Sequence, residues 1–218
     1  MSGLDLRLYA VADPAAMGAR DPVDAVLAAV RGGATLVQLR DKRGDARATV
    51  ALARRLKAAL PPTVPLLVND RIDVAAIAGA DGVHLGQEDL SPAAARALLG
   101  DAAIVGLTVH HAHEATSDAR IDYVGLGPAF ATASKHPRDA PLGPEGLHRL
   151  LGEVRARLGP LPACAIAGID AARAGEVVRA GVDGVAVIGA LFQAADVEAA
   201  ARALRAAVDA ALEDQSEP

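Results

Sequence analysis

Polar and charged residues gather at five points of the chain, each directly after a short apolar segment. These points are 38–42, 69–71, 84–89, 108–110 and the long segment 127–143. Two residues among them, Asp70 and Asp89, are carboxylates that follow neighbouring apolar segments. A pair of carboxylates can hold a Mg²⁺ ion that keeps most of its waters, and such an ion usually accompanies a phosphate substrate.

The same two carboxylates have a second interpretation as helix caps. Asp is a favoured N-cap residue, and the helices expected after them begin near Ile72 and Pro92. For either carboxylate alone, the sequence favours neither interpretation. The presence of Arg40 and Lys42 on a neighbouring segment favours the metal site.

Four cations are expected around these carboxylates, namely Arg40, Lys42, Arg71 and Lys135. Arg can bind a phosphate through two parallel hydrogen bonds, whereas Lys acts as a mobile point charge. A solvated rim is the alternative, mainly for Lys42 and Arg71. Alternation along a strand puts Gln38 and Arg40 on the same side, so we expect both to face the interior of the fold. Side-chain amides such as Gln38 and Asn69 donate and accept at once, which suits the edge of a heterocyclic base.

Hydroxyl and small residues mark a second candidate region. Thr132 and Ser134, beside Lys135, can clasp a carboxylate or a phosphate, although an ordinary polar loop has the same composition. At Gly168 and Gly189 the missing side chain lets backbone amides approach a phosphate at a helix start. Glycine also serves tight turns, so these two positions are weaker evidence.

Two histidines and the single cysteine need separate interpretations. His84 and His110 each end an apolar segment, where they could transfer protons or only orient their neighbours. Cys164 lies within an apolar segment and is predicted to be a small buried hydrophobe.

Apolar segments and amphipathic segments alternate eight times along the chain. We expect strands at 6–13, 35–40, 65–69, 82–85, 103–108, 123–127, 163–167 and 184–188, and helices at 22–33, 45–60, 72–79, 92–99, 112–119, 144–158, 171–180 and 197–212. This order predicts a single-domain (β/α)₈ barrel over residues 1–212, followed by a frayed tail at 213–218. An open doubly wound sheet is the structural alternative. In a barrel, the five polar segments that follow the expected strands converge at the mouth formed by the carboxyl ends of the strands.

The composition narrows the class of function. Lys and Arg number 22 against 27 Asp and Glu, which gives a net charge of −5, and the chain has no Trp, two Tyr and two Phe. This balance argues against a nucleic-acid binder and favours small-molecule substrates. One cysteine excludes a disulfide framework and fits a cytoplasmic protein, and no run of eighteen apolar residues predicts a membrane span. The sequence leaves the oligomeric state open, with a homodimer as an option that barrels often take.

Five motifs in register carry a family resemblance. They are Leu-Tyr-Ala-Val-Ala-Asp at 8–13, Gln-Leu-Arg-Asp-Lys at 38–42, Asn-Asp-Arg at 69–71, Asp-Gly-Val-His-Leu-Gly-Gln-Glu-Asp-Leu at 81–90 and Asp-Tyr-Val-Gly-Leu-Gly-Pro at 122–128. With these motifs the chain resembles the thiamine-phosphate synthase family over nearly its whole length.

The resemblance implies a transferase that joins hydroxymethylpyrimidine diphosphate to hydroxyethylthiazole phosphate, or to its carboxylated form, with Mg²⁺ as cofactor and diphosphate as leaving group. It implies a pyrimidine diphosphate site made by Gln38, Leu39, Arg40, Asp41, Lys42, Asn69, Thr108 and Lys135. It implies a thiazole phosphate site made by Thr132, Ala133, Ser134, Gly168, Ile188 and Gly189. Asp70 and Asp89 match the metal ligands, and Arg40, Lys135 and Thr108 match residues expected to act in catalysis.

Departures from the family pattern keep alternatives open. The family usually has Gly where this chain has Ala167 and Ser where it has Gly189, so the thiazole side departs more than the pyrimidine side. A related branch isomerises the thiazole without diphosphate or metal, and there a His matching His110 transfers a proton. A non-catalytic regulator that binds a phosphate ligand on the same scaffold is the third option. The joint presence of both metal-ligand carboxylates, Arg40 and Lys135 favours the synthase.

Overall fold

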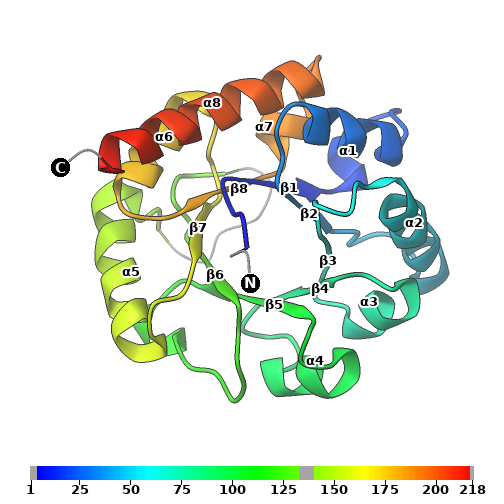
Figure 1. The fold of residues 1–218 in the computed structure, drawn as a ribbon, viewed down its shortest axis with the longest axis horizontal. Coiled ribbons are helices and arrows are strands. Elements are labelled where there is room, and N and C mark those ends of the chain that lie inside the picture. The colour runs from blue at the N-terminus through cyan, green and yellow to red at the C-terminus, as the bar shows by residue number, and fades with distance from the viewer. Residues whose placement is uncertain (1–3, 133–139, 217–218) are drawn as a thin grey trace.

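A computed structural model describes residues 4–132 and 140–216, and its centre is a closed barrel of eight parallel strands (Figure 1). The strands are β1 (Leu8–Ala12), β2 (Leu36–Leu39), β3 (Leu66–Asn69), β4 (Gly82–Leu85), β5 (Ile104–Val109), β6 (Tyr123–Leu126), β7 (Ala163–Ile166) and β8 (Gly184–Val187). Each strand pairs with the next in the chain, and β8 closes the barrel by pairing with β1. The predicted (β/α)₈ barrel is therefore confirmed, and the open sheet is excluded.

Helices surround the barrel on its outside (Figure 1). They are α1 (Pro22–Arg31), α2 (Ala46–Ala59), α3 (Ile72–Ala78), α4 (Pro92–Leu99), α5 (Gly143–Leu158), α6 (Ala171–Arg179), α7 (Gly189–Phe192) and α8 (Val197–Ser216), with 3₁₀ turns η1 (Pro14–Ala16) and η2 (Ala112–Glu114). Among the helices of residues 4–132 and 140–216, none is both long and apolar enough to cross a membrane.

The fifth unit of the barrel differs from its prediction. A helix was expected over 112–119, but only the 3₁₀ turn η2 forms there. The Glu114 carboxylate accepts from the backbone N–H of His110 at 2.6 Å, Ser117 Oγ donates to a nearby carbonyl, and the Asp118 carboxylate accepts from a backbone N–H of α4. These side chains bind backbone groups locally, and such bonds compete with a helix.

The C-terminal end differs as well. Residues 213–216, expected in a frayed tail, continue α8, which runs to Ser216. Gln215 Nε2 donates to the carbonyl of Val178 at 2.6 Å, and Asp214 forms an ion pair with Arg179 of α6 at 2.9 Å. These contacts with the neighbouring helix hold the last turns in place.

The protein has one hydrophobic layer between strands and helices and a second inside the barrel. The strands are buried on both faces, which explains why their sequences do not alternate with polar residues. The interior cluster consists of Leu6, Tyr9, Val11, Leu36, Leu67, Tyr123, Cys164 and Ala186. It contains both tyrosines of the chain.

One hydrogen-bond arrangement recurs at the amino end of the barrel, on every second strand. The side chains of Thr35, Asp81, Asp122 and Asp183, which precede the even-numbered strands, accept from the N–H of Leu8, Leu66, Val105 and Ala163 at 3.2, 2.8, 2.8 and 2.8 Å. In each case the backbone N–H of the accepting residue donates back to the carbonyl of the same partner. We call these four reciprocal pairs the amino-end clamps.

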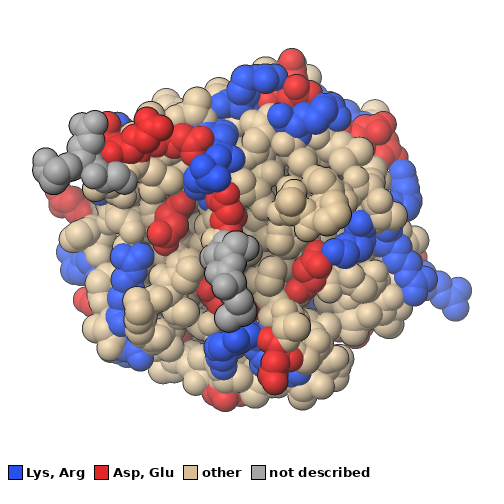
Figure 2. All heavy atoms as spheres, viewed as in Figure 1, with Lys and Arg blue, Asp and Glu red and all other residues tan. Residues whose placement is uncertain are grey.

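The three clamp aspartates also hold cations. Their partners are Lys57 at 2.6 Å from Asp81, Arg96 at 2.7 Å from Asp122 and Arg155 at 3.6 Å from Asp183. Figure 2 shows acidic and basic side chains close together in several places on the face that it views. The amino end of the barrel is therefore held by short backbone bonds and ion pairs.

Burial makes a clear prediction for the single thiol. Cys164 lies on β7 with no exposed surface, and burial raises its pKa to about 12. Because the thiolate is the reactive form, iodoacetamide should leave the folded protein unmodified at neutral pH and alkylate it completely after denaturation. Mass spectrometry of the intact protein measures this. Alkylation of the folded protein at the rate of a free cysteine would show that the interior opens readily.

Candidate active site

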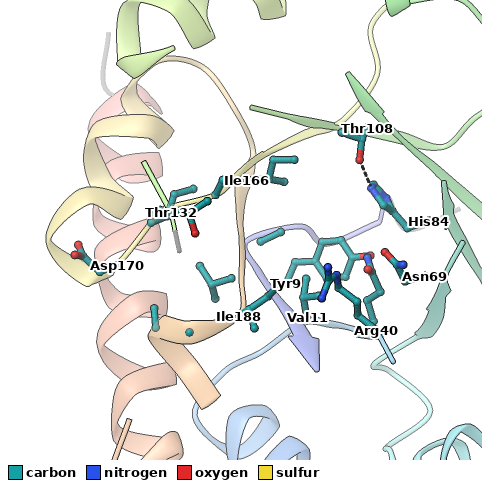
Figure 3. A pocket seen from close by; sticks show the side chains of 18 of the residues that line it. Tyr9, Val11, Arg40, Asn69, His84, Thr108, Thr132, Ile166, Asp170 and Ile188 are labelled. Carbon is teal, nitrogen blue, oxygen red and sulfur yellow. Dashed lines mark hydrogen bonds between the residues drawn. The ribbon is translucent and has the colours of Figure 1, made fainter. Parts of the chain in front are cut away.

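A cavity of about 500 Å³ opens at the carboxyl ends of the strands (Figure 3). Nine of the residues that the family resemblance assigns to substrates or metal line it, namely Gln38, Arg40, Asn69, Asp70, Thr108, Thr132, Gly168, Ile188 and Gly189. They come from six strands and the loops that follow them, as expected for the mouth of a barrel. The cavity brings together the two regions that the sequence marked separately.

Gln38 and Arg40 both line the cavity, as their alternation on β2 predicts. The Arg40 guanidinium forms an ion pair with Asp13 after β1, and the two side chains are only 14% and 13% exposed. A largely buried guanidinium with one carboxylate partner keeps further N–H donors for an anion. Arg40 is therefore a fixed cation in the wall of the cavity.

The two candidate metal ligands contact each other rather than capping helices. Ser91 is the N-cap of α4, and Arg71 occupies the N-cap position of α3 without a side-chain bond, so the capping interpretation of Asp70 and Asp89 is wrong. Asp70 has a φ of 62°. A non-glycine residue in this left-handed region is uncommon, and such strain tends to lie at functional sites.

The pKa values of Asp70 and Asp89 are shifted in opposite directions. Burial would raise the pKa of Asp70, but hydrogen bonds with Lys42 and Asp89 hold it below its usual value. Burial and the neighbouring Asp70 together raise the pKa of Asp89, which also accepts from the N–H of Gly86 at 2.7 Å. Two partly buried carboxyls that crowd each other form a site that a divalent cation would neutralise.

The pair provides a small ligand set for a metal. Within the described residues, no three His, Cys, Asp or Glu side chains cluster in a way that could hold an ion. Mg²⁺ commonly takes only one or two carboxylates and completes its octahedron with waters and substrate phosphates. Asp70 and Asp89 therefore fit Mg²⁺ better than an ion that needs an all-protein cage.

The loops after β6 and β7 meet tightly at the other side of the cavity. Gly168 has a φ of 69°, and a Cβ there would lie 2.5 Å from the carbonyl oxygen of Ala131 and 2.8 Å from Cβ of Phe130. Ala167, next to it, is the second non-glycine residue with a positive φ, at 74°. The contact between the two loops therefore leaves no room for a side chain at Gly168.

Arg173 is a cavity residue that the sequence analysis missed. It lies in the first turn of α6, with its guanidinium 4.9 Å from the ring centre of Phe130, and it donates to the carbonyl of Gly168 at 3.0 Å. A cation in the first turn opposes the helix dipole, and this unfavourable placement was the available signal. Arg173 joins the two loops and adds positive charge beside them.

The remaining predicted residues lie elsewhere. Leu39 is buried in the layer between strands and helices, and the Asp41 carboxylate accepts from the N–H of Gly44 at 2.7 Å within its own loop. Lys42 is tied to Asp70 at the rim. Ala133, Ser134 and Lys135 fall outside the described residues.

Of the two candidate histidines, one lines the cavity and the other does not. His84 is 8% exposed and lines the cavity, where its Nε2 lies 2.7 Å from Thr108 Oγ1 (Figure 3). His110 does not line the cavity, and its Nδ1 lies 2.6 Å from the carbonyl oxygen of Gly127. Of the two, only His84 is placed to influence a bound molecule.

A parallel eight-stranded barrel with a charged cavity at the carboxyl ends of its strands defines a (β/α)₈-barrel enzyme. The family model described as thiamine monophosphate synthase matches residues 8–191. The chain belongs to this family, and it is a transferase.

Relatives support this membership over nearly the full length. A thiamine-phosphate synthase of Xanthobacter autotrophicus is 51% identical over 210 residues, with 95% of this chain and 97% of the relative covered. One of Agrobacterium fabrum is 43% identical over 215 residues, with 97% and 98% covered. The solved structure of a thiamine phosphate pyrophosphorylase from Pyrococcus furiosus superposes with a TM-score of 0.83 at 33% identity, covering 96% of this chain and 98% of that one.

The contact between the two loops predicts the effect of a side chain at Gly168. Gly168→Ala places a Cβ in a left-handed residue, which costs about 1–2 kcal/mol, and also against Ala131 and Phe130. Gly79→Ala is the matched control, because Gly79 has the same φ of 69° but no neighbour near its Cβ. Denaturant unfolding should show a loss about 1 kcal/mol or more larger for Gly168→Ala than for the control. Equal losses would show that the loops can separate freely.

Proposed function

We propose that the protein is a thiamine-phosphate synthase that joins hydroxymethylpyrimidine diphosphate to hydroxyethylthiazole phosphate or its carboxylated form. The observation that carries the proposal is the composition of the cavity at the carboxyl ends of the strands. Arg40 and Asp70, which contacts Asp89, lie on one side, and the glycine-containing loops after β7 and β8 lie on the other. Two phosphorylated substrates need two anion sites that face one reacting centre, and the position of Arg40 opposite the glycine-containing loops supports such an arrangement.

In the proposed reaction, the bond between the methylene carbon of the pyrimidine and the diphosphate oxygen breaks. The diphosphate leaves with the electron pair, and the amino group on the pyrimidine ring delocalises the positive charge left on the carbon. The thiazole nitrogen then donates its lone pair to this carbon, which forms the C–N bond of thiamine phosphate, and a carboxylated thiazole also loses its carboxyl group as CO₂. No protein nucleophile or strong base is required.

The residues of the chain have defined parts in this reaction. Arg40, held by Asp13, stabilises negative charge as it develops on the leaving diphosphate. Gln38, Asn69 and Thr108 orient the pyrimidine through hydrogen bonds. The loops at Gly168 and Gly189 hold the thiazole phosphate by backbone amides, which brings the ring nitrogen near the carbon and lowers the entropic cost of the bimolecular step.

Several assignments in this proposal come from the family resemblance. Lys135 is assigned to the diphosphate, and Ala133 and Ser134 join Thr132 at the thiazole phosphate. Leu39, Asp41 and Lys42 complete the segment assigned to the pyrimidine substrate. Ile188, which lines the cavity beside Gly189, is assigned to the thiazole side.

Asp70 and Asp89 are the residues that would hold Mg²⁺. When bound, the ion neutralises part of the negative charge that the diphosphate carries away. The crowding of the two carboxyls, with the raised pKa of Asp89, supports this assignment.

The alternatives account for fewer of these features. A metal-independent thiazole tautomerase would use His110 for proton transfer, but that ring lies outside the cavity lining and bonds to the carbonyl of Gly127. A regulator that only binds phosphate needs neither the carboxylate pair nor Arg40. Both alternatives leave the pyrimidine side of the cavity without a use.

The direct test incubates the purified protein with both substrates and Mg²⁺, with and without a chelator, and follows thiamine phosphate by chromatography. We expect product that the chelator abolishes and added Mg²⁺ restores. Conversion of the carboxylated thiazole tautomer without metal, and no thiamine phosphate, would move the assignment to the tautomerase branch. Binding of phosphate ligands without any turnover would indicate the regulator.

Asp89→Ala tests the metal assignment. Loss of one of two carboxylates should lower kcat by about 100-fold and shift the Mg²⁺ titration to higher concentration, since a bound metal supplies several kcal/mol of charge stabilisation. Asp101→Asn is the control, because Asp101 is an exposed acid just before β5, at the opposite end of the barrel. An unchanged Mg²⁺ titration for Asp89→Ala would remove Asp89 from the metal site.

A further inference from the structure

A continuous chain of hydrogen bonds crosses the interior of the barrel. Gln38 Nε2 on β2 donates to the hydroxyl of Tyr9 on β1, which lies 2.8 Å from the hydroxyl of Tyr123 on β6. The Tyr123 hydroxyl lies 2.8 Å from Nδ1 of His84 on β4, whose Nε2 lies 2.7 Å from Oγ1 of Thr108 on β5. Five side chains from five strands thus form one series, and we call it the interior chain.

The side chains of the interior chain are almost fully buried, and Gln38, His84 and Thr108 among them line the cavity. Exposure is 1% for Tyr9, 0% for Tyr123, 8% for His84, 5% for Thr108 and 3% for Gln38. Burial raises the pKa of both tyrosines well above the usual value, so each keeps its hydroxyl proton at neutral pH. Each phenol therefore has one proton to donate, and its bonds must run in a single direction.

That direction follows from the amide at one end. Because Gln38 donates to Tyr9, the Tyr9 proton must go to Tyr123, and the Tyr123 proton must go to Nδ1 of His84. A His whose Nδ1 accepts carries its proton on Nε2, and that proton is donated to Thr108 Oγ1. The hydroxyl proton of Thr108 is then directed away from His84, toward the cavity that Thr108 lines.

The packing around the interior chain fits the rings of its two tyrosines closely. Gly106 on β5 faces the ring of Tyr123, and any Cβ at this position would overlap the ring. Tyr123 also stacks on His84 with ring centres 5.5 Å apart and meets Tyr9 edge to face at 5.8 Å. The two tyrosines are thus fixed by shape as well as by hydrogen bonds.

We propose that Tyr9, Tyr123 and His84 are positioning residues that carry the hydrogen-bond direction set by the Gln38 amide across the barrel to Thr108. They thereby make Thr108 a donor toward the bound pyrimidine. The effect on turnover rests on the proposed function, whereas the direction of the interior chain does not. The two parts are therefore tested separately.

The first test reads the tautomer of His84 directly, without substrate. Nitrogen NMR of protein labelled at histidine, with the His84 signal assigned by its loss in His84→Gln, should show the proton on Nε2. In Tyr123→Phe, which removes the donor to Nδ1, the signal should change to a mixture of tautomers. A proton on Nδ1 in the unsubstituted protein, or a doubly protonated ring at neutral pH, would overturn the proposal whatever the enzyme does.

The second test measures the kinetics of the same variant. Tyr123→Phe should lower kcat/KM for the pyrimidine diphosphate by about tenfold and leave KM for the thiazole phosphate within about twofold, because Thr108 lies on the pyrimidine side. Cys164→Ala is the packing control, since it removes volume from the same interior cluster without removing any hydrogen bond of the interior chain. Equal losses for both substrates, or the same losses in Cys164→Ala, would show general loosening and overturn the positioning role.

Absence of thiamine phosphate from the unsubstituted protein would count against the proposed function, while the NMR result still decides the direction of the interior chain.

Discussion

The burial of two tyrosine hydroxyls at the centre of the barrel sets conditions on much of the structure. A phenol removed from water loses several kcal/mol unless its hydroxyl finds partners, so Tyr9 and Tyr123 require polar side chains on the neighbouring strands. Gln38 and His84 supply them, and no described buried side-chain nitrogen or oxygen lacks a partner. The polar floor of the cavity is thus the visible end of a network that begins deep inside the barrel.

The contacts that stabilise the barrel gather at its amino end, whereas the candidate site lies at its carboxyl end. The amino-end clamps and their ion pairs hold adjacent strands together and contain no residue assigned to substrates. Residues at the other end have unfavourable geometry, such as the positive φ of Asp70 and Ala167. Asp70 and Ala167 directly follow β3 and β7, and a clamp holds the first residue of each of these two strands.

The sequence predicted the barrel because eight apolar segments repeat with little interruption, and pairing of successive parallel strands then brings their carboxyl ends together. The absence of a helix over 112–119 was not predicted, because the alternation of strands and helices along the chain calls for a helix there. The side-chain bonds of Glu114 and Asp118 to backbone N–H groups that compete with the helix become apparent only in the folded structure. Rejecting the cap interpretation of Asp70 and Asp89 needed the observation that Arg71 and Ser91 occupy the two cap positions. Arg173 and the partners of Tyr9 were missed because contacts between distant strands and loops leave no periodic signal in the chain.

The amino-end clamps have a consequence for how the barrel can be divided. Each clamp joins an odd-numbered strand to the even-numbered strand that follows it, and none joins an even strand to the next odd one. The barrel is therefore built from four modules of two strands each, with the same bond repeated in every module. New chain ends placed between modules would leave all four clamps intact, whereas ends placed within a module would separate the partners of one clamp. The natural units for circular permutation, and for growth of such a barrel by duplication, are these pairs of strands.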